Sequence, residues 1–386
     1  MPPLPMNDFR FNSDAVAAAK GLAILLMVAG HAKCPQYLQE YLGMIRMPVF
    51  FIMSGYCFKA KYLDDAATFV KKRVKGIWWP FVKWMLVFTV LHNVLFELNV
   101  YNDVFGYGGE VSSKYTWREM GVKCFKALFF CANEQLVGGY WFLKELFWGS
   151  LIGYGCIRCT RGMRGRLTSF GVQGGVVLML LLVFAYIGRD FHIPGIFPNQ
   201  RTWMATLFFL FGHAWREAEE GGTILSRYDG LPWWRQLPIV VVLGVGVKVI
   251  IILFGHTTMV SFTLRNALPY VVAALCGSVM VVYVCRWIVG RAWFLQRFLV
   301  FTGRHTFEVL TWHLSCFKLV SLLMIAIYGL SMEHLACFTV ISTATLQAAG
   351  VDVEWTLWWW AYLTVGAGIP ILWKVKSEKL KVKNEK

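Results

Sequence analysis

Two basic residues on one expected helix, Lys20 and His31, are the first candidates for chemistry. They lie eleven residues apart in the apolar run KGLAILLMVAGH. In a helix this spacing is three turns plus about 20°, so both side chains project from one face, about 16 Å apart along the axis. The spacing predicts a cation at one mouth of a membrane helix and a titratable imidazole deeper on the same face. Ionisable groups at membrane depth are costly and usually functional.

A second histidine, His313, ends the similar run GRHTFEVLTWH. The alternative role for each histidine is a structural hydrogen bond inside a helix bundle. The register of His31 with Lys20 favours a functional role for His31. No such partner supports His313, because Glu308 lies five residues away and off its face.

The segment RMPVFFIMSGY contains a second group of candidates. Pro48 can kink a helix near its end, where neighbouring groups satisfy the freed carbonyl. Ser54 and Gly55 are small and allow helices to approach closely. Packing is favoured over a nucleophilic role for Ser54, because no GxSxG, HExxH, Walker or GxGxxG motif occurs in a suitable context. No cluster of metal ligands is evident in the sequence.

The composition indicates that a membrane surrounds these residues. Of 386 residues 57% are hydrophobic and only 16% are charged, whereas soluble domains contain about 25% charged residues. These values exclude a disordered chain, a coiled coil and a typical cytosolic enzyme. The net charge of +16 is better explained by basic membrane loops than by nucleic-acid binding. Most of the ten cysteines lie within or beside apolar runs and are interpreted as small buried hydrophobic residues.

The predicted fold is an all-α integral membrane bundle of about ten transmembrane helices. A span needs roughly 20 apolar residues, and the candidates are 15–32, 42–58, 77–98, 139–157, 171–188, 202–215, 237–254, 267–285, 306–328 and 355–373. Residues 121–137 and 335–349 are expected to be interfacial or re-entrant. Lys and Arg favour the loops on the side of the N-terminus by 24 to nine, which places both termini in the cytoplasm. The predicted parts are a cytoplasmic segment 1–14, a membrane domain 15–373 and a basic tail 374–386.

Taken together, these residues resemble the acyltransferase-3 family of multipass membrane proteins, which includes fucose 4-O-acetylase-like glycan acetyltransferases. The resemblance runs from about Ser13 to Trp373, and its most specific part is the basic-x10-His pattern of Lys20 and His31. The MPxFFxxSGY block is matched by Met47, Pro48, Phe50, Phe51, Ser54, Gly55 and Tyr56. Weaker similarities are Trp141, Phe142 and Leu143, then Phe211 and Gly212, and finally Gly303, Thr306 and His313.

Two positions depart from the family pattern. The family places Asp three residues before the basic residue, where this chain has Ala17, and Asp14 lies three residues further back. Asp14 is therefore either a helix-capping residue or a displaced replacement for the family Asp. The cytoplasmic RxxR pattern is imperfect, because Gly76 stands near the position of the second Arg.

The resemblance implies transfer of an acyl group, typically acetyl, from acetyl-CoA to a sugar hydroxyl. His31 would act as general base or would itself accept the acyl group, with Lys20 and His313 as further catalytic residues. Lys72, Arg73 and Lys75 would bind the anionic donor on the cytoplasmic side. Pro48, Phe51, Ser54, Gly55, Tyr56 and Trp141 would pack near the site. The expected setting is a bacterial inner membrane, with a polysaccharide or lipid-linked glycan as acceptor, and without a tightly bound cofactor, a metal or a nucleic acid.

Two other classes of protein are compatible with the same residues. A proton-coupled sugar or glycan transporter would use Lys20 and His31 as a coupled pair, although the inverted-repeat hydropathy of many transporters is not apparent. A sensor or structural membrane component with a degenerate site is the third class. Acetyl-CoA turnover distinguishes the enzyme from both.

Overall fold

Every regular element is helical in the residues that the computed structural model describes, which are 13–163, 166–190, 197–220, 231–351, 353 and 358–384. The predicted all-α class is confirmed for these residues. Most of the predicted N-terminal segment, residues 1–12, lies outside them. The chain forms two compact units, and α1 (Ser13–His31), α2 (Gln36–Ile45) and α7 (Trp141–Cys159) contribute to both.

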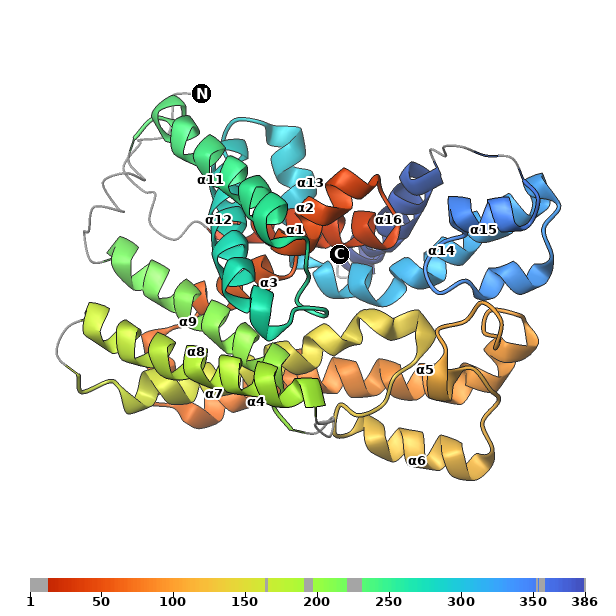
Figure 1. Ribbon diagram of the computed structural model, residues 1–386, viewed down its shortest axis with the longest axis horizontal. Helices are drawn as coiled ribbons and strands as arrows, with labels where there is room; N and C mark the ends of the chain where they lie inside the picture. Colours follow the sequence, from red (N-terminus) through yellow and green to blue (C-terminus); the bar gives the residue numbers. More distant parts are fainter. Residues whose placement is uncertain are drawn as a thin grey trace. The chain divides into compact units, whose positions relative to one another are not determined.

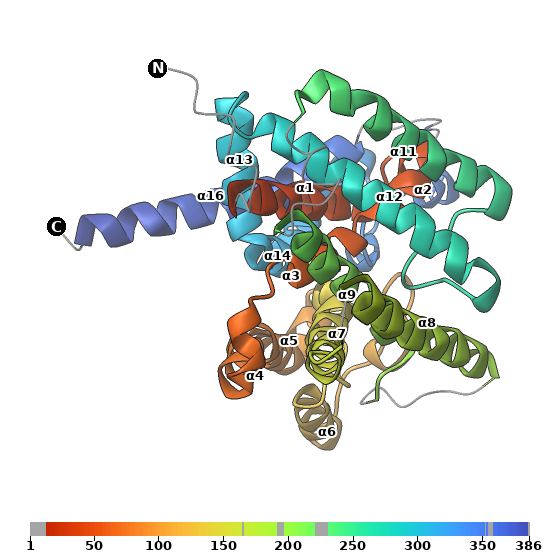
Figure 2. The same cartoon turned by 90° about the vertical axis from the view of Figure 1, so that its left-hand side faces the viewer.

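The first unit consists of Met1–Ala23, Glu40–Val74 and Glu145–Arg304. Its further helices are α3 (Pro48–Tyr56), η1 (Ala60–Leu63), α4 (Ala66–Arg73), α8 (Arg166–Asp190), α9 (Gln200–Glu220), α11 (Trp233–Phe254), α12 (Leu264–Ile288) and α13 (Trp293–Arg304). Helix α9 packs against both α3 and α8, and α11 runs beside α12 (Figure 2). A core of buried side chains, including Phe58, Phe69 and Phe209, joins η1, α4, α8 and α9.

Glycines allow the backbones in this unit to approach very closely. A Cβ on Gly55 of α3 would meet Phe209 O of α9, and a Cβ on Gly212 of α9 would meet Ile52 O of α3. The same relation joins α1 to α13, where Gly303 lies against the Ala17 carbonyl. Small residues at such crossings allow the extensive van der Waals contact that holds membrane helices together.

Among the residues that the structure describes, six helical stretches are long and apolar enough to cross a membrane, which confirms several apolar spans but not ten. They are Ser13–His31, Ala66–Glu97, Ser169–Ile187, Trp233–Phe254, Leu264–Ile288 and Thr306–Tyr328. Many of their apolar side chains face outward, as Val242 and Ile252 do at 68% and 70% exposure. Such exposure of large aliphatic residues fits contact with lipid.

The four other predicted spans are helical in part but do not meet this standard. The stretch 42–58 is divided between α2 and α3, because Pro48 lacks a backbone N–H and starts a new helix at its first turn. The charged residues Lys144 and Glu145 interrupt the apolar sequence of the continuous helix α7. The C-terminal end of α9 is rich in charged residues. The final stretch belongs to α16 (Trp358–Asn384), whose second half is basic; residues 354–357 lie outside the described residues.

The second unit consists of Ile24–Gln39, Lys75–Lys144 and His305–Lys386. Its further elements are η2 (Val74–Trp78), α5 (Trp79–Glu97), η3 (Gly109–Val111), α6 (Trp117–Ala127), η4 (Gln135–Tyr140), α14 (Thr306–Tyr328), η5 (Met332–Ala336), α15 (Thr343–Ala348) and α16. Helices α14 and α16 pack together, as do α5 and α6 (Figure 1). Residues 374–384 continue α16 without a break, and Lys374 Nζ lies 2.6 Å from Glu308 Oε1 of α14.

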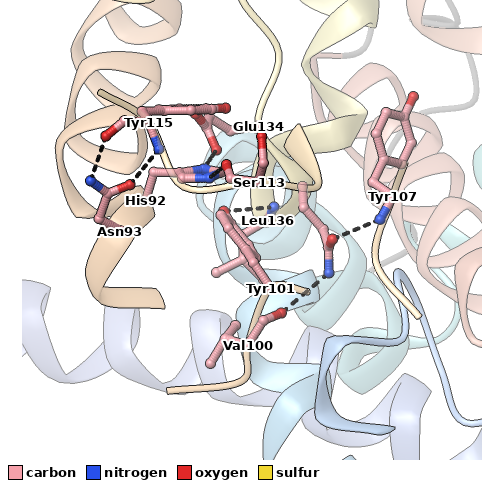
Figure 3. A network of polar contacts seen from close by, with 10 residues as sticks. His92, Asn93, Val100, Tyr101, Tyr107, Ser113, Tyr115, Glu134 and Leu136 are labelled. Atoms are coloured by element: carbon pink, nitrogen blue, oxygen red, sulfur yellow. Dashed lines mark hydrogen bonds and ion pairs between the residues drawn. The ribbon is translucent and has the colours of Figure 1, made fainter. Parts of the chain in front are cut away.

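Residues 113–134 form a hairpin that enters and leaves at the same end of α5. Asn93 binds the backbone of Tyr115 at one end of α5, and Trp78 Nε1 donates to Leu128 O at the other. The chain then returns to the first end of α5, where Glu134 Oε2 lies 3.0 Å from His92 Nδ1 (Figure 3). Tyr115 OH donates to the same carboxylate over 3.0 Å. This path follows α5 for about 22 Å and back, and residues 121–134 of it belong to the region 121–137 expected to be interfacial or re-entrant.

Candidate active site

The two candidate histidines meet, although 282 residues separate them. His31 is the last residue of α1, and His313 lies in the second turn of α14. His31 Nδ1 is 3.0 Å from His313 Nε2, and the ring centroids are 5.1 Å apart. His313 is fully buried, whereas His31 is partly exposed. The arrangement therefore combines an accessible imidazole with a buried one that fixes its orientation.

The surrounding carbonyl groups assign the tautomer of each ring. His313 Nδ1 lies 3.1 Å from Val309 O and 2.9 Å from Leu310 O. Since carbonyl oxygens only accept, Nδ1 of His313 carries hydrogen and its Nε2 carries a lone pair. Nε2 then accepts from Nδ1–H of His31. The basic nitrogen of neutral His31 is consequently Nε2, the atom that a general base or nucleophile uses.

The wall beside His313 is formed by the short helix η4. Gly139 presents no side chain to the ring, and a Cβ there would lie 3.9 Å from His313 Cε1. Tyr140 OH is 2.7 Å from Thr311 Oγ1 and ties η4 to α14. Phe317 meets the His313 ring edge-on, at a centroid distance of 5.8 Å. These contacts restrict rotation of His313 and thereby hold the histidine pair.

Lys20 belongs to a group of cations around Cys57 in the first unit. Its charge and those of Lys59, Arg73 and Arg216 all act on the Cys57 thiol. Arg216 is also paired with Glu220 at 2.7 Å. Lys59 and Arg216 were not singled out from the sequence, because they lie on separate elements and have no motif. The grouping places four cationic side chains in one region of the first unit.

The three predicted donor-binding residues have different surroundings. The Arg73 guanidinium lies 4.8 Å above the Phe69 ring, and its Nε is buried without a hydrogen-bond partner among the described residues. Lys72 is exposed and donates to Tyr62 OH over 2.9 Å. Lys75 is exposed on the turn η2. Arg73 is thus the member of the trio that shares the surroundings of Cys57 with Lys20.

The MPxFFxxSGY block forms the packed helix α3. Phe51 is buried, and Gly55 makes the backbone crossing with α9. Ser54 Oγ is buried and makes no hydrogen bond to the described residues. A serine nucleophile needs an adjacent base, so this geometry favours the packing role. Trp141 begins α7 and meets Phe142 edge-on, at a centroid distance of 6.5 Å.

Tyr56 takes part in a buried polar network that sequence reasoning missed. Its hydroxyl donates to the Glu219 carboxylate, and Arg286 Nη2 is 2.6 Å from Glu219 Oε1. The Arg286 guanidinium also lies over the rings of Trp215 and Tyr283. Since a buried carboxylate needs such partners, the network explains how charge is tolerated between α3, α9 and α12.

Asp14 has a structural partner at the start of α1. Its Oδ1 lies 2.8 Å from Arg304 Nη2, at the end of α13. Ala17, at the position of the family Asp, lies at the close crossing with Gly303. Ala17 is buried, so the structure has an apolar residue in the core at this position. Among the described residues, no group of three His, Cys, Asp or Glu side chains could hold a metal ion.

The chain belongs to the acyltransferase-3 family. The family model, described as an acyltransferase domain, matches residues 14–373, which confirms the resemblance noted in the sequence. With the six apolar stretches, this match defines the protein as a multi-pass membrane acyltransferase-family member. Neither the comparison with curated proteins nor that with solved structures finds a match.

Proposed function

We propose that this protein is an O-acyltransferase that moves an acetyl group from cytoplasmic acetyl-CoA to a sugar hydroxyl. The acceptor is a cell-surface polysaccharide or a lipid-linked glycan, and the setting is a bacterial inner membrane. The observation that carries the proposal is the hydrogen bond between His31 and His313, because it orients a basic nitrogen in a family of acyltransferases. This geometry supports a role for each histidine, with His31 as the base and His313 as the residue that positions it.

In the proposed reaction His31 Nε2 acts as the general base. It takes the proton of the acceptor hydroxyl as the hydroxyl oxygen bonds to the thioester carbonyl carbon. The carbon–sulfur bond then breaks, and the coenzyme A thiolate leaves and receives that proton from His31. His313 is a positioning residue, which stabilises the imidazolium by accepting from Nδ1–H.

A covalent route uses the same nitrogen. His31 Nε2 would bond to the thioester carbonyl carbon as the carbon–sulfur bond breaks and the coenzyme A thiolate leaves. The sugar hydroxyl oxygen would then bond to the acetyl carbon as the bond to Nε2 breaks, and the hydroxyl proton would pass to the thiolate. Incubation with labelled acetyl-CoA in the absence of sugar, followed by rapid quenching, separates the two routes. A label on His31 supports the covalent route. An unlabelled His31, in protein that transfers acetyl groups once sugar is added, supports the general-base route.

The cations around Cys57 are proposed to bind the donor phosphates. Lys20, Lys59, Arg73 and Arg216 supply positive charge where their fields converge. Lys20 and His31 lie three turns apart on the same helix, α1. Lys72 and Lys75 are proposed to attract the donor at the exposed entrance.

Replacing Arg73 with glutamine is expected to raise the KM for acetyl-CoA at least about tenfold, with kcat little changed. The reason is the loss of a charge-assisted hydrogen bond, worth about 1.5–3 kcal/mol. Initial rates at saturating sugar measure both constants. Lys71→Gln is the matched control, because Lys71 is an exposed cation on the same helix. An effect of Arg73→Gln confined to kcat would contradict donor binding.

The function itself is tested with purified protein in liposomes, carbon-labelled acetyl-CoA and a panel of methyl glycosides. Label transferred to a sugar supports the enzyme. Sugar flux without acetyl-CoA turnover would instead identify a transporter. Inside-out and right-side-out vesicles then test the side of donor entry, since the proposal requires acetyl-CoA on the cytoplasmic face.

A further inference from the structure

Two segments of the second unit fold back along α14 toward His313. The segment η5 follows the end of α14 in the sequence. Lys318 lies inside α14, yet its Nζ donates to Leu335 O over 2.8 Å and to Cys337 O over 2.7 Å. Lys318 lies ten residues before the end of α14, which corresponds to about 15 Å. The buried ammonium therefore fastens the segment 332–338 well inside the length of the helix. η4 is the second segment, since Gly139 lies beside His313.

These two segments and the loop containing Tyr107 form one assembly. The buried Gln135 accepts from the Tyr107 N–H over 2.9 Å and donates to Ala336 O over 2.7 Å. Gly138 lies against the Phe338 ring, since a Cβ there would be 2.8 Å from its Cζ. A path of packed contacts thus leads from His313 through Gly139 and Gly138 to Phe338.

The path ends at an aromatic pair that reaches the surface. The rings of Tyr107 and Phe338 have centroids 4.5 Å apart and are inclined at 57°. Tyr107 is 43% exposed, and Phe338 is partly exposed. Polar groups surround the pair: Asn102 Nδ2 donates to Glu333 O, and Gln135 binds the Tyr107 backbone. An exposed aromatic pair with this polar support has the character of a polar ligand site rather than of a lipid-facing surface.

We propose that Tyr107 and Phe338 form the binding surface for the acceptor sugar. This inference rests on the proposed function. The weakly positive axial C–H bonds of a pyranose ring meet the negative π-face of an aromatic ring. Stacking on the pair places one sugar at the outer end of these contacts, beside η4, whose Gly138 and Gly139 contact the rings of Phe338 and His313. The site accepts a neutral or weakly charged hexose unit of a glycan.

The test measures sugar binding and turnover separately. Saturation-transfer NMR with methyl hexosides and methyl 6-deoxyhexosides records binding to the full chain in nanodiscs. We expect signals with the wild type and with His31→Ala, and loss of most of the signal with Tyr107→Ala or Phe338→Ala. In acyl transfer, these two variants are expected to raise the sugar KM about tenfold while the acetyl-CoA KM stays unchanged.

Three variants control for changes in folding and surface. Tyr107→Phe keeps the ring and is expected to retain binding. Gly138→Ala displaces the Phe338 ring without removing it and is expected to raise the sugar KM. Trp117→Ala removes an aromatic side chain that is 89% exposed on α6 and is expected to change nothing.

The outcomes distinguish this inference from the proposed function. Unchanged sugar signals in Tyr107→Ala and Phe338→Ala would overturn the inference, as would the absence of signal from every glycoside with the wild type. Sugar binding that depends on Tyr107 without acetyl transfer would overturn the proposed function and leave the binding surface supported.

Discussion

Replacing His31 with alanine is expected to lower acyl transfer about 10³- to 10⁴-fold, while the protein still folds in the membrane. The substitution removes the basic Nε2 that the hydrogen bond to His313 orients, and a general base alone contributes about 10²- to 10⁴-fold. Both KM values should change little, because the proposed donor and acceptor contacts are made by other side chains. Initial rates with labelled acetyl-CoA measure the loss, and size-exclusion profiles in detergent monitor folding. Transfer at the wild-type rate would disprove the assignment.

Replacing the partner histidine, His313, should lower kcat less than replacing His31. His313→Ala is expected to lower kcat about 10²-fold, because His31 loses the acceptor that fixes its tautomer and stabilises its imidazolium. His313→Asn can present an amide oxygen to the same Nδ1–H and should restore part of the rate. A purely structural role for His313 predicts no such rescue, and loss of folded protein in both variants.

Replacing Gly55 or Gly212 with alanine is expected to cost at least about 3 kcal/mol of stability and most of the folded yield. Each new Cβ would lie far inside 3.0 Å of a backbone carbonyl oxygen on the opposite helix, a separation that real Cβ atoms essentially never show. Since the obstacle is backbone, no rotamer change relieves it, and α3 and α9 must move apart. Thermal unfolding in detergent, followed by fluorescence size exclusion, measures the loss.

Gly246→Ala provides the matched control for the helix crossing. Gly246 lies inside α11, and a Cβ there meets nothing within 4 Å. Alanine is the better helix former by about 1 kcal/mol, so this variant should be as stable as the wild type or more stable. Equal melting temperatures for Gly55→Ala and the wild type would show that α3 and α9 do not cross as closely as described here.

Prediction from the sequence works best for properties that depend on neighbouring residues. Runs of apolar residues predict helices such as α11 and α14 because an isolated span satisfies its own backbone hydrogen bonds. The same reasoning placed one helix across 42–58, where the structure has two, because Pro48 lacks a backbone N–H and begins α3. Charged side chains such as Glu145, which accepts from Thr202 Oγ1 over 2.5 Å, make other helices too polar for the simple membrane criterion.

The same distinction between local properties and long-range contacts applies to the candidate site. By itself the sequence determined the helical membrane class, the family motifs and two histidines in costly surroundings, because composition and spacing within one helix are local properties. The tertiary structure alone decided that His31 bonds to His313, that Lys59 and Arg216 join Lys20 and Arg73 around Cys57, and that Gly55 faces the backbone of Phe209. These contacts join residues far apart along the chain, and side-chain periodicity within a helix carries no information about which distant helix it will meet.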